Sequence, residues 1–287
     1  MILRPRVQPS LLERKTMHDP SSSRIPALLL SAIGALAALW APGAAAQDEP
    51  VGDGGADQWR LGVMGSISDD AYAGADASTS VLPLIYFDGR WLFFHATEGG
   101  VHLYRSGAFT LDALLSLGGQ EMDPDDLGRR ELTAAGVDRD RLDDRDRSYY
   151  AGLAGTWRTP FGVLGAEAQT DISGNAEGER YHGYYAYPWQ AGDLRITPSL
   201  GVTYLSGRIT DYYFGVDTDE SLDGSYAYYP DAALVPGAGL DLAYALNRDW
   251  AVYAGLEYQH YPDEIADSPL IEDDHAVSFH SGISYSF

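Results

Sequence analysis

Apolar and polar side chains alternate along most of residues 58–287, and this pattern constrains the fold more than any other feature of the sequence. The stretches FTLDALLSL (109–117) and WAVYAGLEY (250–258) are two of its clearest cases. Successive side chains of a β-strand point to opposite faces, so a period of two predicts strands with one apolar and one polar face. The sequence shows no comparable amphipathic helix.

The alternation predicts about twelve strands, with boundaries uncertain by about ±2–4 residues. They begin near residues 58, 79, 90, 100, 108, 148, 161, 179, 193, 231, 249 and 275. Short connections are expected at 88–90, 106–108, 159–162, 190–193 and 246–249. The intervening connections are mostly long and acidic, at 68–77, 119–147, 206–226 and 262–274. The short link near 96–99 breaks this rule.

Short turns at one end and long loops at the other are typical of outer-membrane barrels. A sheet in hydrocarbon must close on itself, because every backbone group needs a partner there. The sequence therefore predicts an all-β fold: a transmembrane antiparallel up-and-down β-barrel of about 12 strands with both termini periplasmic. Aromatic residues should ring the membrane interfaces. The candidates near strand ends are Trp59, Trp91, Trp157, Trp189 and Trp250.

The chain ends on an aromatic residue in the middle of an alternating stretch, HAVSFHSGISYSF. Phe279, Ile283, Tyr285 and Phe287 lie on its apolar face and have the form of the signal that barrel-assembly machinery reads. The chain would stop there because its last strand pairs with its first. The alternative, a buried strand of a soluble sandwich, would need neither an export signal nor the asymmetry of the loops.

The N-terminal region predicts export. Arg24 precedes an apolar core over 25–40 and small residues ending at Ala44–Ala46, the order of a secretory signal, and the chain starts at Met1 or Met17. The core is too short for a comfortable membrane span, so a membrane anchor is the weaker alternative. The expected organisation is a signal peptide with an N-terminal extension over 1–46, a short periplasmic linker over 47–56 and an outer-membrane barrel over 57–287.

The net charge of −23 argues against nucleic acid as a partner, because both surfaces are anionic. Two interpretations of the acidity stay open: adaptation for solubility or salt, and the gathering of cations at a surface. The absence of cysteine excludes disulfides and thiolate metal sites.

Charged residues on the polar face of the strands are expected in the barrel lumen. The candidates are Arg60, Asp112, Glu167, Asp171, Arg180, Asp241, Glu257 and His280. A narrow barrel fills its interior with side chains, and buried charges need partners. The set therefore predicts a structural polar network, with a small polar pore as the alternative.

Catalytic chemistry is not expected. Ser278 and His280 share a strand face but lie about 7 Å apart by strand rise, too far for direct contact. The sequence has no G-x-S-x-G elbow and no H-E-x-x-H motif. Acidic stretches such as DTDESLDG (217–224) do not match a calcium loop. No enzyme, cofactor or metal site is predicted, and weak divalent binding that bridges lipopolysaccharide is the remaining metal hypothesis.

Several short segments resemble the MltA-interacting protein (MipA/OmpV) family of Gram-negative outer-membrane proteins. They are LPLIYFDGRWLFF (82–94), DISG (171–174), DYYFGV (211–216), DSPL (267–270) and GISYSF (282–287). The resemblance covers nearly all of the exported part and implies an outer-membrane barrel. One member is regarded as a scaffold that joins a lytic transglycosylase to a murein synthase, and others are linked to adhesion or stress response.

Two functions follow as hypotheses. The first is a non-catalytic scaffold for murein synthesis and hydrolysis, whose partners are membrane lipid, lipopolysaccharide, the barrel-assembly machinery, a murein synthase and a lytic transglycosylase. The second is a narrow channel or a surface adhesin acting through the acidic loops. Tyr212, Tyr213 and Phe214 in the DYYFGV motif are the candidates for a surface contact. The alternatives for these aromatics are an aromatic girdle at the outer interface and a loop that folds back on the barrel rim.

Overall fold

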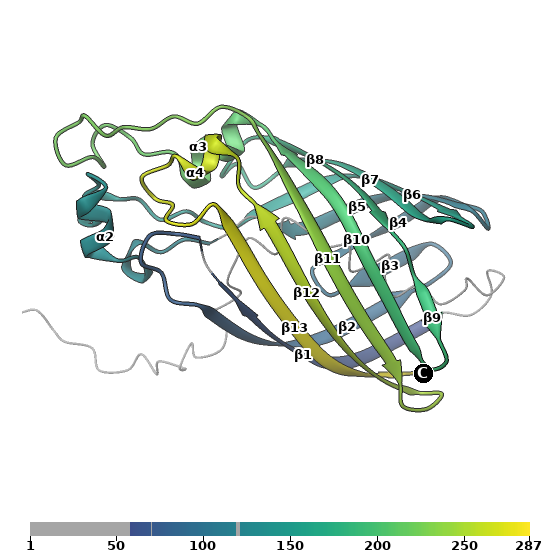
Figure 1. Cartoon of the computed structure of the whole chain (residues 1–287). Helices are drawn as coiled ribbons and strands as arrows, with labels where there is room; N and C mark the ends of the chain where they lie inside the picture. The colour runs from purple at the N-terminus through teal and green to yellow at the C-terminus, as the bar shows by residue number, and fades with distance from the viewer. Residues whose placement is uncertain (1–57, 70, 119–120) are drawn as a thin grey trace, which may run out of the picture. The chain divides into compact units, whose positions relative to one another are not determined.

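The computed structural model describes residues 58–69, 71–118 and 121–287. The predicted signal peptide (1–46) and linker (47–56) lie outside the described residues. The described strands form one antiparallel sheet (Figure 1). β13 pairs with β1, and β10 pairs with β11 as well as with β8, so the sheet closes into a barrel.

The strands are β1 (Gln58–Ser68), β2 (Ser78–Asp88), β3 (Leu92–His95), β4 (Glu98–Arg105), β5 (Phe109–Gly118), β6 (Ser148–Thr159), β7 (Gly162–Asp171), β8 (Glu179–Ala186), β9 (Trp189–Ala191), β10 (Leu194–Leu205), β11 (Ala233–Ala245), β12 (Trp250–His260) and β13 (His275–Ser286). The helices are η2 (Pro124–Asp126), α2 (Arg129–Ala134), η3 (Arg139–Arg141), α3 (Gly207–Phe214) and α4 (Asp263–Ala266).

The barrel wall has twelve positions although thirteen strands carry labels. β8 and β9 both pair with β10, the first along Ser199–Leu205 and the second along Leu194–Ile196. They are two parts of one wall strand, interrupted at Pro188, which has no N–H to donate to a ladder. The predicted number of strands is therefore confirmed, and every predicted start lies within two residues of an observed one.

The connections fall into two groups, as the sequence predicts. Short turns join the strands at one end, which we call the short-turn end, and longer loops join most of them at the other, the loop end. The short connection between β3 and β4, at residues 96–97, is the exception, as predicted. The first and last strands meet at the short-turn end, where the Phe287 N–H donates to the Trp59 carbonyl at 3.0 Å. The five tryptophans predicted at the membrane interfaces all lie exposed at this one end: Trp59, Trp91, Trp157, Trp189 and Trp250.

The two faces of the wall differ in polarity. Outward-facing side chains are large, apolar and exposed, as at Val81, Leu115 and Leu200, whereas inward-facing Ser199 and Thr203 are buried. The alternation in the sequence therefore separates an apolar outer surface from a polar lumen. In the described part of the chain, no helix has the length and apolar character needed to cross a membrane.

Glycine makes the closing seam between β1 and β13 possible. Gly62 faces inward on β1, and a Cβ atom there would collide with the carbonyl oxygen of Ile283 on β13. Three residues on, a Cβ at Gly65 would lie 3.7 Å from the Ser80 carbonyl oxygen, an ordinary contact. Of these two β1 glycines, Gly62 is therefore the one that the close approach of the strands requires. Gly282 on β13 is also constrained, since a Cβ there would lie 2.5 Å from the Val63 carbonyl oxygen.

We predict that Gly62→Ala lowers the stability of the folded barrel by about 1–3 kcal/mol, because the added methyl group forces the β1–β13 backbones apart. Unfolding by denaturant in lipid vesicles measures this loss. Gly65→Ala is the matched control and should unfold like the unaltered protein. Equal stabilities for the two variants would contradict the role given to the seam.

Candidate functional site

A cluster of charged side chains lies in the lumen against β2, β4 and β5. His102 Nδ1 lies 2.7 Å from Asp112 Oδ1, and the two residues are register partners across the β4–β5 pair. Arg105 Nη2 donates to both carboxylate oxygens of Asp88, at 2.7 and 2.9 Å. His102 Nε2 lies 3.8 Å from Asp88 and links the two pairs.

The same cluster borders a small polar cavity of about 60 Å³. His95 and Glu98, which flank the β3–β4 turn, meet at 3.4 Å on one side of it. Arg158 donates to Thr110 at 3.2 Å on another side. This volume holds a few waters at most, so the cavity suits water and protons better than an organic ligand.

A second network lies in the lumen near the loop end. Arg180 donates through Nη2 to Gln169 Oε1 at 2.6 Å and to Ser116 Oγ at 3.1 Å. Gln169 donates in turn to Glu167 at 2.9 Å. The Arg180 guanidinium also lies 4.1 Å from the centre of the Tyr150 ring, a cation–π distance. The network joins β5, β6, β7 and β8.

The opposite wall carries fewer charged contacts. His280 Nε2 on β13 lies 3.5 Å from Asp241 Oδ1 on β11. Glu257 is half-buried on β12, between these two strands. The guanidinium carbon of Arg60 on β1 lies 4.9 Å from the centre of the Tyr86 ring.

Asp171 differs from the other candidate lumen residues. Its carboxylate accepts hydrogen bonds from the Ser173 N–H at 2.7 Å and the Glu177 N–H at 2.8 Å, both in the loop that follows β7. Asp171 thus orders the DISG turn instead of joining the lumen network, because it is the last residue of its strand.

Seven of the eight predicted residues face the lumen, as the alternation of side chains along each strand predicts. Several of their hydrogen-bond partners were not predicted. The residues missed are Asp88, His102, Arg105 and Gln169, which supply most of the short hydrogen bonds. His102 was detectable in principle, since it shares the inward parity of β4. Arg105 was not, because a register shift between His102 and Tyr104 reverses the parity at the end of β4. Whether the lumen set has a function stays a prediction.

The long loops pack together into a structure that we call the loop cap, formed by residues 71–77, 121–147, 206–232 and 261–274. Its apolar core includes Leu132, Val137, Ile209 and Ile265, all completely buried. The core continues into the barrel mouth through inward-facing residues of four strands. These are Tyr150, Leu205, Ala233, Val235 and Ala276. The loop end is therefore filled by packed side chains, with α3 and α4 side by side (Figure 1).

The proposed surface-contact residues are interior, which corrects the prediction for the DYYFGV motif. Tyr213 and Phe214 are 3% and 2% exposed, and Tyr212 is half-buried. They lie at the C-terminal end of α3, whose buried face points into the loop cap. The motif therefore packs the loops onto the barrel rim, which was one of the two alternatives.

Hydrogen bonds fix these tyrosines in place. The Tyr213 hydroxyl lies 3.0 Å from Ser148 Oγ, and the Tyr72 hydroxyl donates to the Tyr213 carbonyl at 2.9 Å. The Tyr212 hydroxyl accepts the Asp146 N–H at 2.8 Å. Burial raises the pKa of both Tyr212 and Tyr213, so the two phenols stay protonated at neutral pH. Burial also raises the pKa of neighbouring Asp211.

One buried ion pair connects two loops of the cap. Arg145 Nη2 donates to Glu220 Oε1 at 2.9 Å, and the side chains are only 10% and 4% exposed. Glu220 also accepts the backbone N–H groups of Asp143 and Asp217, at 3.0 and 2.8 Å. Glu220 is thus fully committed to joining loop 121–147 to loop 206–232 and is not available as a metal ligand.

The remaining loop charges mostly pair locally at the surface. Arg129 donates to Asp140 at 2.7 Å, and this hydrogen bond lowers the pKa of the Asp140 carboxyl. Arg141 pairs with Asp138 at 3.1 Å. Within the described ranges, no three His, Asp or Glu side chains are grouped so that they could hold a metal ion.

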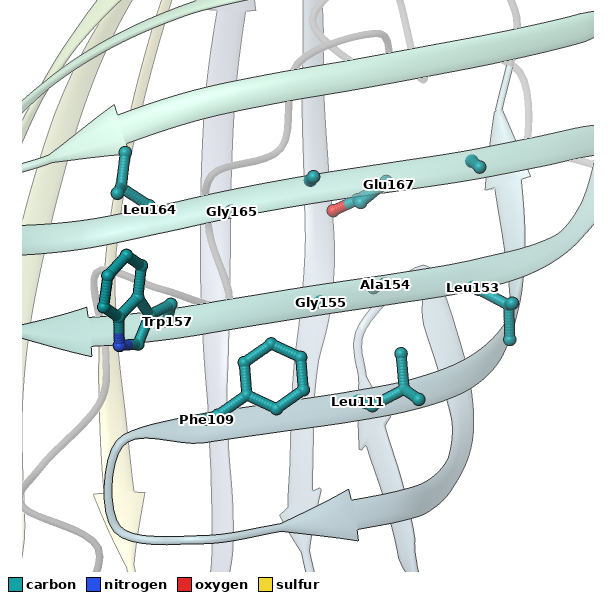
Figure 2. A pocket seen from close by; sticks show the side chains of 11 residues that line it. Phe109, Leu111, Leu153, Ala154, Gly155, Trp157, Leu164, Gly165 and Glu167 are labelled. Carbon is teal, nitrogen blue, oxygen red and sulfur yellow. The ribbon is translucent and has the colours of Figure 1, made fainter.

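Two open depressions mark the outer face of the barrel. Figure 2 shows the first, of about 480 Å³, where Phe109, Trp157 and Leu164 surround small residues of β6 and β7. The second, of about 650 Å³, lies over β3, β4 and β5 and is lined almost entirely by apolar atoms. Their position on the apolar face indicates contact with hydrocarbon and not with a dissolved substrate.

Comparison with known proteins assigns the family. Residues 61–287 match the family described as MltA-interacting protein MipA. The chain belongs to the MltA-interacting protein family. YiaT of Escherichia coli (strain K12) is 29% identical over 81% of this chain and 92% of its own length. The MltA-interacting protein of the same organism is 27% identical over 80% and 90%.

The outer membrane is the location that the relatives indicate. Outer membrane protein OmpV of Vibrio cholerae is 24% identical over 54% of this chain and 64% of its own length. The protein is thus an outer-membrane β-barrel of the MipA/OmpV type. Among solved structures, the NanC porin aligns at 11% identity over 78% of this chain and 98% of its own, with a TM-score of 0.41. A COG4313 outer membrane channel from Pseudomonas putida F1 aligns at 13% over 84% and 97%, with a TM-score of 0.42. At that level neither structure bears on function.

We predict that Arg145→Met loosens the loop cap by about 3–5 kcal/mol, because it leaves the Glu220 carboxylate buried without its cation. Digestion by proteinase K of the barrel in vesicles should then cleave loops 121–147 and 206–232 faster. Arg129→Met, which breaks an exposed pair, is the control and should leave cleavage unchanged. Equal cleavage of both variants would show that the buried pair does not hold the cap.

Proposed function

We propose that the protein is a non-catalytic scaffold of the outer membrane that engages periplasmic murein enzymes through its short-turn end. The observation that carries this proposal is the packed loop cap, which occupies the opposite end with its own apolar core. The name of the relative, MltA-interacting protein, supports a lytic transglycosylase as one partner. A murein synthase is the second partner proposed.

The proposal requires the short-turn end, and with it both termini, to face the periplasm. Short periplasmic turns and longer extracellular loops are the usual arrangement in such barrels. The predicted export signal upstream of β1 would deliver the chain from the same side. The exposed groups available there include Phe161, Arg90 and Arg248, each in a different turn.

The C-terminal strand supports a further partner, the barrel-assembly machinery. Phe279 on the outer face of β13 is 45% exposed, and Phe287, directly after the strand, is 72% exposed. Ile283 and Tyr285 lie between them on the same face. An apolar row that ends in Phe suits recognition before the strand closes on β1. Lipopolysaccharide is the proposed neighbour of the loop end.

We predict that a lytic transglycosylase co-purifies with the tagged, full-length protein from native envelopes. Reversing two turn charges together, Arg90→Glu with Arg248→Glu, should reduce its recovery several-fold, because these exposed guanidinium groups lie on the proposed contact surface. Recovery is measured by quantitative mass spectrometry.

The matched control is Arg130→Glu, the same reversal at an exposed site on the loop cap. Recovery of the partner should not change with this variant. If the unaltered protein captures no murein enzyme, or if the control loses as much as the double variant, the scaffold proposal fails.

The polar lumen favours a second candidate, a narrow channel. Charged side chains line the interior on both sides, and the cavity beside the His102 cluster is about 60 Å³. Such a lumen would pass water, protons or small ions at a low rate. The alternative of a surface adhesin has less support, because the acidic loop 121–147 is folded into the cap and pairs much of its own charge.

We predict a conductance in planar bilayers well below that of open porins, since the loop cap fills the mouth of the barrel. Arg145→Met, which loosens the cap, should raise the frequency of brief openings. Large and stable currents from the unaltered protein would contradict a closed mouth and favour the channel over the scaffold.

A further inference from the structure

The barrel wall is incomplete beside one strand. β3 spans only Leu92–His95, so it pairs with β2 only at Tyr86, Phe87 and Asp88. From Ser78 to Leu84, β2 keeps its partner β1 on one side. On the other side, none of the described strands pairs with it.

Hydrogen bonding defines the edge that is left free. The Ala96 N–H donates to the Ile85 carbonyl at 2.9 Å, so the backbone groups of Ile85 point away from β1. The backbone groups of alternate residues in a strand point the same way. The backbone groups of Thr79, Val81 and Pro83 therefore point toward the missing neighbour. No described residue supplies a backbone partner to these three on that side. Pro83 has no N–H, which discourages the addition of a further strand.

The turn that shortens the wall is itself strained. Ala96 adopts a φ of +53°, a left-handed conformation that costs energy for a residue with a Cβ atom. It is followed closely by Gly99 and Gly100, which are poor strand formers. On the far side β5 continues past the turn, since the Leu117 N–H donates to the Thr97 carbonyl at 2.9 Å.

We propose that the free edge of β2, the β3–β4 turn and the end of β5 frame a lateral opening in the barrel wall, which admits the hydrocarbon chain of a membrane lipid. The inference is independent of the scaffold role, because it concerns the wall and not the short-turn end. We call the opening the lateral gap.

The chemistry around the lateral gap selects a hydrocarbon chain as the occupant. Val81 and Pro83 face outward at its edge and carry no charge, and Val81 is 67% exposed. The 650 Å³ depression on the outer face adjoins it, bordered by Phe94, Gly99 and Leu115. A chain lying in this depression reaches the turn at the base of the gap. The unpaired carbonyls of β2 need water, which the polar lumen can supply from within.

Single cysteines test the proposal, since the natural chain has none. Leu82→Cys places a thiol on the inner face of β2 at the gap. Met64→Cys is the matched control: Met64 is the register partner of Leu82, is equally half-buried, and lies on β1 between two complete neighbours. Each protein, reconstituted in vesicles, is treated with a maleimide at the end of a phospholipid acyl chain. A small water-soluble maleimide measures the intrinsic reactivity of each thiol, and the rate of labelling by the lipid-borne maleimide is divided by that value.

We expect the lipid-borne maleimide to label Leu82→Cys several-fold faster than Met64→Cys after normalisation. Equal labelling of the two would overturn the proposal. Ser80→Cys and Ser66→Cys form a second matched pair across β1 and β2, in case one substitution prevents folding. Val81→Cys tests the rival occupant, because rapid disulfide dimers through this edge would assign it to a second copy of the chain and overturn the assignment to lipid.

Discussion

The structure depends on one constraint: backbone N–H and C=O groups in contact with hydrocarbon need partners within the protein. A single sheet meets this need only by closing, and the pairing of β13 with β1 achieves it. Closure brings Phe287 beside Trp59 and explains why Gly62 is required at the seam. The same constraint makes β2 unusual, because its residues from Ser78 to Leu84 have a strand partner on one side only. Pro83 at that edge is consistent with a strand that is meant to stay without a neighbour.

Closure also creates a lumen, and the charged side chains inside it need partners. Buried charges are costly unless they are paired, so Asp88, His102, Arg105 and Asp112 form one cluster and Arg180 organises another. Arg180 contacts the ring of Tyr150, which belongs to the apolar core of the loop cap. The polar interior and the apolar cap are therefore one continuous packed structure. A substitution in the cap should alter the position of the Arg180 side chain in the lumen.

The sequence predicted the barrel well because the period of two is a local signal that each strand carries by itself. Strand starts, the two kinds of connection and the lumen parity of Glu167 and His280 all follow from it. The sequence could not give the loop cap, whose core joins residues as distant as Tyr72 and Phe214. For that reason Tyr213 and Phe214 resembled surface aromatics although they are buried. The His102–Asp112 contact was equally hidden, since it depends on the register between β4 and β5.

These features together constrain how anything could move through the protein. The loop cap fills the mouth with packed apolar side chains, and the lumen below it is narrow and charged. A polar solute entering from the loop end would have to displace a core that holds the completely buried Leu132 and Ile265. An apolar chain entering from the side would meet the free edge of β2 and the β3–β4 hairpin, where Phe94 and Gly99 border the outer depression. The proposed lateral gap beside β2 thus offers a route that does not cross the packed loop cap, and this route leads from the membrane and not from solution.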